Sequence, residues 1–96
     1  MKAYWIAHVT VTDPEAYAGY QALAPAAFAA HGARFLARGG AHEVMEGPSL
    51  DRHVVIEFPS REAAEAWYHS PEYQAILPHR KANSEGHIAI VDGFEG

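Results

Sequence analysis

The sequence predicts one α+β domain spanning residues 1–96, with a four-stranded antiparallel sheet and two helical segments on one face. Short stretches in which apolar residues alternate indicate strands, and Ser, Thr or Asp followed by Pro or Glu indicates helix starts. The third observation is the order of these elements. The order β-α-β-β-α-β matches a ferredoxin-like split βαβ unit.

The first half contains one strand and one long helix. Residues 3–12 alternate as a strand, with Trp5 and Val9 on one face and His8 on the other. Asp13-Pro14 then starts a helix that Gly32 ends, and Pro25 inside it predicts a kink. Its apolar stripe is Tyr17, Tyr20, Ala24, Ala27, Phe28 and His31.

A hairpin follows. Residues 33–46 are predicted as a strand interrupted at Arg38-Gly39-Gly40, where two glycines indicate a bulge or a close backbone approach. The turn-forming residues 47–51 return the chain into a strand over residues 53–58. In that strand one face is Val54, Ile56 and Phe58, and the other is His53, Val55 and Glu57.

The second helical region starts at Ser60 and restarts at Ser70. Its inner stripe is Ala63, Ala64, Trp67, Tyr68, Tyr73, Ile76 and Leu77. Pro78 is expected to bend or end the second piece. Residues 87–92 are predicted as the last strand.

Composition restricts the class of protein. The formal net charge of −5 argues against a nucleic-acid binder, whose binding surface is basic. The sequence has no cysteine, so neither disulfides nor thiolate metal sites are expected. No apolar run approaches membrane-spanning length, and the start lacks a signal-peptide core, so the expected location is the cytoplasm.

The sheet is predicted to mediate a homodimer. Two helical segments cover one face, yet both faces carry apolar residues, including Val55, Ala89 and Val91 on one side. An exposed apolar sheet face of this size is typical of an association site, and two such sheets packed together form a symmetric dimer. The alternative is a monomer with a half-apolar exposed sheet.

Four sequence blocks resemble a known family. Thr12-Asp13-Pro14-Glu15-Ala16-Tyr17, Arg38-Gly39-Gly40, residues 54–60 (VVIEFPS) and residues 66–74 (AWYHSPEYQ) are similar to domain-of-unknown-function family 1330. The resemblance spans essentially the whole chain. It implies a dimeric α/β barrel built from ferredoxin-like subunits. That superfamily includes cofactor-independent oxygenases, isomerases, degradative enzymes and haem proteins.

Two charged strand residues are candidates for chemistry. Arg38 could hold a carboxylate through its two-donor guanidinium, while Gly39 beside it lets a ligand approach. Glu57 could act as a general base or orient Arg38 from the neighbouring strand. The structural alternative is an ion pair between Arg38 and a nearby acid such as Glu57.

His8 is a candidate acid or base near neutral pH, with a satisfied core or interface histidine as the alternative. Tyr20, Trp67 and Tyr73 are candidates for lining an apolar pocket, or they form simple core. The seven histidines show no HxxxH or HExxH pair, so no metal site is predicted.

These observations predict a homodimeric small-molecule-binding protein without a bound cofactor, whose ligand is a small organic acid or aromatic. Enzymatic proton transfer or oxygenation is one possibility. The alternative is a non-catalytic ligand-binding or structural dimer module.

Overall fold

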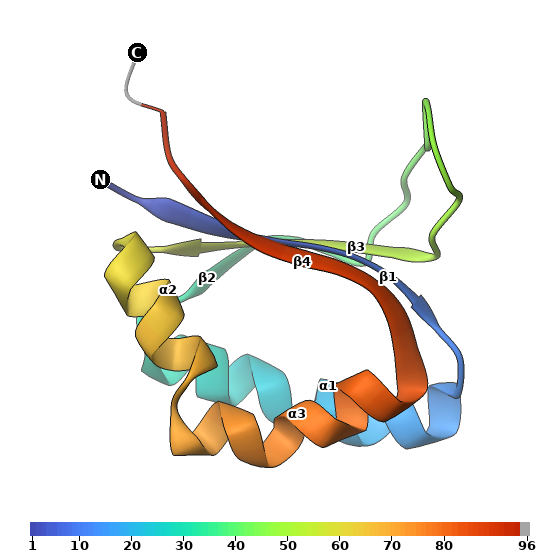
Figure 1. Cartoon of the computed structure of the whole chain (residues 1–96), viewed down its shortest axis with the longest axis horizontal. Helices are drawn as coiled ribbons and strands as arrows, with labels where there is room; N and C mark the ends of the chain where they lie inside the picture. Colours follow the sequence, from blue (N-terminus) through green and yellow to red (C-terminus); the bar gives the residue numbers. More distant parts are fainter. Residues whose placement is uncertain (95–96) are drawn as a thin grey trace.

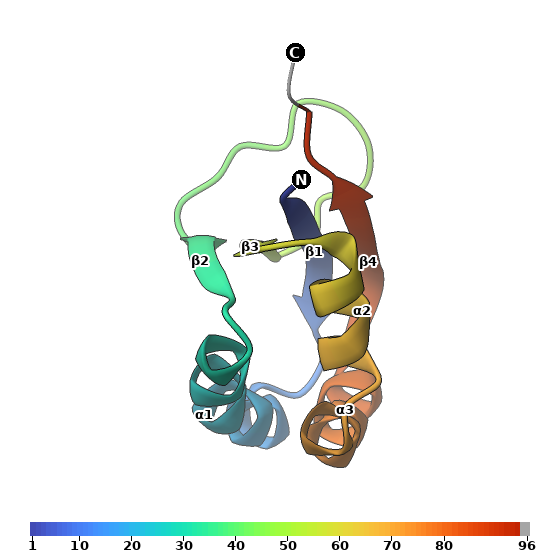
Figure 2. The ribbon, with the colours of Figure 1, turned by 90° about the vertical axis from the view of Figure 1, so that its left-hand side faces the viewer.

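The computed structural model describes residues 1–94 and confirms the ferredoxin-like α+β fold (Figure 1). The elements are β1 (Ala3–Val11), α1 (Pro14–Ala30), β2 (Arg34–Arg38), β3 (Arg52–Phe58), α2 (Arg61–Tyr68), α3 (Pro71–Asn83) and β4 (Ser84–Asp92). The strands form one sheet in the order β2-β3-β1-β4, with every described pair antiparallel. Figure 2 shows all three helices on the same face, with α1 below the β2 side and α2 and α3 below the β4 side.

Each helix begins at a side-chain cap that the sequence indicates. The Asp13 carboxylate accepts a hydrogen bond from the Ala16 amide at 3.2 Å, and the Ser60 hydroxyl accepts one from the Ala63 amide at 3.1 Å. The Ser70 hydroxyl donates to the Trp67 carbonyl at 2.7 Å and accepts from the Tyr73 amide at 3.2 Å. One serine therefore satisfies both the end of α2 and the start of α3.

The core between the sheet and the helices is mainly aromatic. Trp5 on β1 lies 5.3 Å from Phe28 and 5.4 Å from Tyr73, measured between ring centroids. Trp67 on α2 is fully buried and lies 4.8 Å from Phe28 and 5.0 Å from Tyr73. These rings come from four elements, so they join both helical regions to the sheet in one cluster.

Two predicted strand boundaries were wrong. β2 ends at Arg38, not at residue 46, because Gly39 turns the chain with a φ of 63° and residues 39–51 form a loop. β4 begins at Ser84, three residues before the prediction, because the glycine-containing stretch Ser84–Gly86 is extended and pairs with Val9–Val11. Helix α3 continues past Pro78 to Asn83, so Pro78 does not end it, and α1 runs through Pro25 to Ala30, while the bends expected at these two prolines stay predictions.

Candidate ligand-binding pocket

A β-bulge in β2 turns Arg38 toward the helices. Phe35 pairs with Ile56 of β3, but after a register shift Ala37 pairs with Val55 and Arg38 with Val54. If the full strand kept the register of Phe35 without this shift, Arg38 would pair with His53 and would lie on the other face. The bulge therefore places Arg38 on the same face as Phe35, with its Cζ 5.0 Å from the centre of that ring.

Gly39 makes room for a second arginine. Arg52 begins β3 opposite Val9, so its side chain lies on the helix face of the sheet. A Cβ atom at Gly39 would lie 2.9 Å from the Arg52 Cζ and 3.5 Å from its Cγ. The close approach expected at Gly39 is therefore made by the Arg52 side chain.

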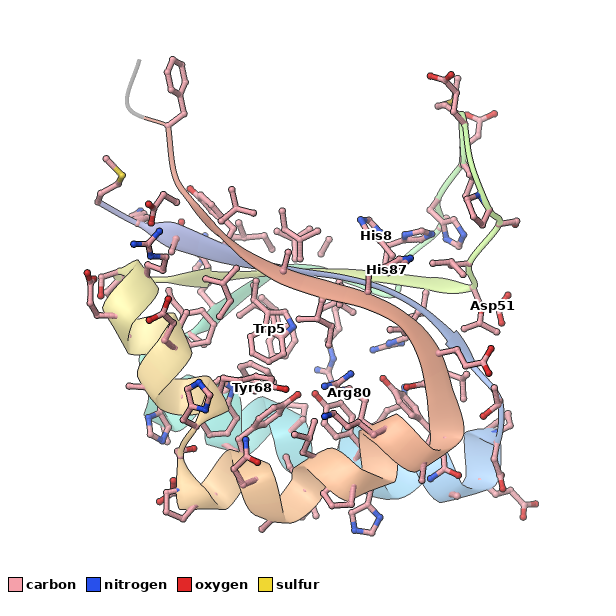
Figure 3. All side chains as sticks on the ribbon, in the orientation of Figure 1. Trp5, His8, Asp51, Tyr68, Arg80 and His87 are labelled. Carbon is pink, nitrogen blue, oxygen red and sulfur yellow. The ribbon has the colours of Figure 1, made fainter. Side chains whose placement is uncertain are left out.

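A third arginine comes from the helix layer. Arg80 on α3 points toward the sheet beside Trp5 (Figure 3). Its Nε donates to the Tyr73 hydroxyl at 3.2 Å, and the Tyr73 and Tyr20 hydroxyls are hydrogen-bonded at 2.9 Å. Tyr73 is fully buried and Tyr20 is nearly so. This chain of hydrogen bonds therefore holds Arg80 from the inside of the protein.

The three arginines line one cavity between the sheet and the helices. Its volume is about 40 Å³, and the exposed Arg38 and Gln21 lie at its rim. The lining is otherwise mainly apolar and comprises Trp5, Ala7, Val9, Tyr17, Tyr20, Ala24, Pro25, Phe28, Phe35, Val54, Ile56 and Ile88. It includes no carboxylate, and none of the ion pairs described within residues 1–94 involves these arginines.

The phenols around the cavity are neutral. Burial raises the pKa of Tyr20 and of Tyr73 above the ordinary value near 10. Burial also raises the pKa of Tyr17, and the nearby charges of Arg52 and Arg80 offset that effect only in part. At physiological pH the phenols therefore supply hydrogen bonds, and they supply no negative charge to balance the guanidinium groups.

The remaining predicted residues are not part of the cavity lining. Trp67 is core, and Tyr73 and Gly39 contribute through Arg80 and Arg52. Glu57 lies on the opposite face of the sheet, where its Oε1 is 3.4 Å from the Lys2 Nζ. The structure therefore does not bring Glu57 to Arg38, because alternate strand residues point to opposite faces and the bulge turns Arg38 inward.

His8 belongs to a row of histidines on the face opposite the helices (Figure 3). It is the direct neighbour of His53 on β3 and of His87 on β4, and the His8 and His53 Nδ1 atoms are 2.7 Å apart. The His42 ring lies 4.2 Å from that of His53. Within residues 1–94 no group of three or more His, Asp or Glu side chains is placed to hold a metal ion.

Arg52 and Arg80 were not selected from the sequence, although both lie in phase with the buried residues of their strand or helix. Arg52 is in phase with Val54, Ile56 and Phe58, so the alternation that buries these residues turns Arg52 inward. Arg80 follows Tyr73 by seven positions and Ile76 by four, which puts it on the buried stripe of α3. An arginine in phase with a core stripe is the signal that finds both.

A family model described as "Domain of unknown function (DUF1330)" matches residues 2–94. The chain belongs to the DUF1330 family. No functionally curated protein shows significant similarity to its sequence.

Solved structures similar to this DUF1330 chain share its fold at low sequence identity. RPA0582 from Rhodopseudomonas palustris, a protein of unknown function, aligns with a TM-score of 0.82 and 19% identity over 99% of this chain and 84% of that chain. SnoaB, a cofactor-independent oxygenase from Streptomyces nogalater, aligns with a TM-score of 0.68 and 15% identity over 99% of this chain and 95% of that chain. An antibiotic biosynthesis monooxygenase aligns with a TM-score of 0.55 and 16% identity over 98% and 99%.

No helix within residues 1–94 is long and apolar enough to cross a membrane.

Proposed function

We propose that this DUF1330 protein binds a small organic acid in the cavity between its sheet and its helices. The observation that carries the proposal is the set of three guanidinium groups, Arg38, Arg52 and Arg80, in a lining without a carboxylate. Partly buried cations without a counter-charge are costly, and a carboxylate ligand supplies the missing charge together with paired hydrogen bonds. The chain as a whole is acidic, so this clustering is not a consequence of composition.

Calorimetric titration with a panel of small carboxylates tests this proposal. Arg38→Met should weaken binding at least tenfold while the fold is kept, and Arg38→Lys should also bind poorly because an ammonium lacks the planar pair of donors. The matched control is Arg34→Met, on the same strand, whose exposed side chain lies opposite Glu57. Unchanged affinity in Arg38→Met, or no binding of any acid by the wild type, would contradict the proposal.

The proposal includes a homodimer formed through the sheet face opposite the helices. The loop at residues 39–51 and the C-terminal segment both rise from that side (Figure 1). Met45 on the loop and Phe94 in the C-terminal segment are 81% and 95% exposed, and Val91 on β4 is 46% exposed. A second copy of the same face would cover these apolar groups together with the half-buried Val55.

Light scattering at micromolar concentration measures this association. The expected mass is about 21 kDa, twice the 10.5 kDa of one chain. Val55→Glu should shift the protein to the monomer, because it would bury a charge in the interface. Leu23→Glu, on α1, is the control, since Leu23 is also an accessible apolar residue, 53% exposed, but lies in the helix layer. A wild-type mass of one chain would refute the dimer.

Catalysis without a cofactor is a second candidate, supported by the structural similarity to the oxygenase SnoaB. The candidate reactions are oxygenation or proton transfer on a small acid or aromatic. The proton-transfer roles predicted for Glu57 and His8 are not assigned to this cavity, because both side chains lie on the other face. Oxygen uptake with a quinol and small-acid panel tests turnover, and binding without turnover would favour the ligand-binding module.

A cytoplasmic location is part of the proposal, and cell fractionation tests it.

A further inference from the structure

The number of cationic groups in the cavity indicates how many negative charges its ligand carries. A ligand with one carboxylate would leave two of the three guanidinium charges unbalanced in a partly buried space. Arg52 and Arg80 are each half-buried, so their charges are only partly solvated. The three arginines therefore favour a ligand with more than one negative charge.

The arginines also lie on two walls. Arg38 and Arg52 come from the neighbouring strands β2 and β3, whereas Arg80 rises from α3 in the helix layer (Figure 3). Arg80 is fixed by the Tyr73 hydroxyl, and Arg52 is confined by its packing against Gly39. A ligand with an acidic group at each end would pair with the donors of both walls.

The rest of the cavity lining is mainly apolar. It includes Val9, Val54 and Ile88 of the sheet and Ala24 of α1. Such surfaces favour a carbon spacer over a ligand that is polar throughout, such as a free oxyanion. The small enclosed volume limits this spacer to a few carbon atoms.

We infer that the ligand of this pocket is a short aliphatic dicarboxylate, with one carboxylate held by Arg38 and Arg52 and the other by Arg80. This inference rests on the proposed acid-binding function and names the class of acid. Each carboxylate is matched to guanidinium donors, and the carbon spacer lies against the apolar lining.

The decisive experiment compares acids of equal carbon number on the wild-type protein. Propionate and malonate, butyrate and succinate, and pentanoate and glutarate are titrated by calorimetry at constant ionic strength. At least one diacid should bind ten or more times as tightly as its monoacid partner. Inorganic phosphate and sulfate are titrated in parallel as multiply charged ions without a carbon spacer.

Variants then assign the second carboxylate. Arg80→Gln should reduce the preference for the diacid to within about threefold, and Arg34→Gln, outside the cavity, should leave it unchanged. If Arg80→Gln does not fold, the wild-type comparison alone still decides the inference.

Equal affinity for monoacids and diacids would overturn the inference and leave the acid-binding function standing. Binding of no acid at all would overturn both. Phosphate or sulfate binding as tightly as the best diacid would show that charge without the spacer is sufficient, which also overturns the inference. An unchanged preference in a folded Arg80→Gln variant would refute the role of the helix wall.

Discussion

Replacing Gly39 by alanine tests how the pocket is positioned. Gly39 has a φ of 63°, a conformation that costs an L-residue about 1–2 kcal/mol. The new Cβ would also lie 2.9 Å from the Arg52 Cζ, so the guanidinium must move. Because that group is the free end of a flexible side chain, its movement adds little to the cost. We therefore expect a loss of about 1–2 kcal/mol in stability, roughly 4–16 °C in melting temperature for a domain of this size.

The same substitution should have a larger effect on ligand binding than on stability. Displacing Arg52 removes one of the two sheet-side guanidinium groups, so acid affinity measured by calorimetry below the melting transition should fall about tenfold or more. Gly40→Ala is the matched control, since a Cβ there meets no atom within 4 Å. Wild-type affinity in a folded Gly39→Ala protein would refute the positioning of Arg52 by Gly39. An equal loss in Gly40→Ala would attribute the effect to the loop as a whole.

Three further predictions concern stability. Trp67→Ala should lower the free energy of unfolding, measured in urea, by about 3–5 kcal/mol, because Trp67 is fully buried. Trp67→Phe should cost clearly less, because the indole N–H has no hydrogen-bond partner within residues 1–94 that the substitution could remove. An unchanged unfolding midpoint in the alanine variant would contradict the packing. Gly86→Ala should lower the melting temperature more than Gly47→Ala, since a Cβ at Gly86 would lie 2.7 Å from the Val9 Cα of β1, whereas a Cβ at Gly47 meets no atom within 4 Å. Equal melting temperatures would show that β4 shifts away from β1 at no cost in stability. Burial raises the pKa of Tyr20 and Tyr73, so the folded state holds these protons to higher pH than the unfolded state. The contribution of these two tyrosines to the free energy of unfolding should be fully present below about pH 10 and fall above it, by up to about 1.4 kcal/mol per pH unit for each tyrosine, and Tyr20→Phe should reduce that slope.

The sequence was sufficient for the fold because its signals are local. Asp13, Ser60 and Ser70 cap the helices as their side chains predict, and the alternation in residues 53–58 correctly separates Ile56 from Glu57. Each of these inferences uses only neighbours in the chain, whose geometry the period of a helix or strand determines.

The site was harder to predict because it depends on register and on long-range contacts. Simple alternation along β2 would place Arg38 and Phe35 on opposite faces, and only the one-residue shift against β3 puts them together. Arg52 packs against Gly39, although the loop separates these residues in the sequence. The sequence shows only the glycines, and they are therefore interpreted as space for a ligand. The row of His8, His53 and His87 likewise results from strand pairing, which spacing along the chain does not reveal.

The bulge in β2 determines how far after the aromatic residue an arginine must lie in order to reach the cavity. Phe35 and Arg38 are three positions apart, and the one-residue shift against β3 puts them on one face. Deleting one residue between Phe35 and Ala37 would restore simple alternation, keep Phe35 opposite Ile56 and leave Arg38 opposite Val54, so the arginine would stay on the cavity side. A regular β2 of unchanged length would instead turn Arg38 to the far side of the sheet. In relatives of this chain, an arginine two positions after the β2 aromatic in a regular strand should therefore be equivalent to one three positions after it in a bulged strand.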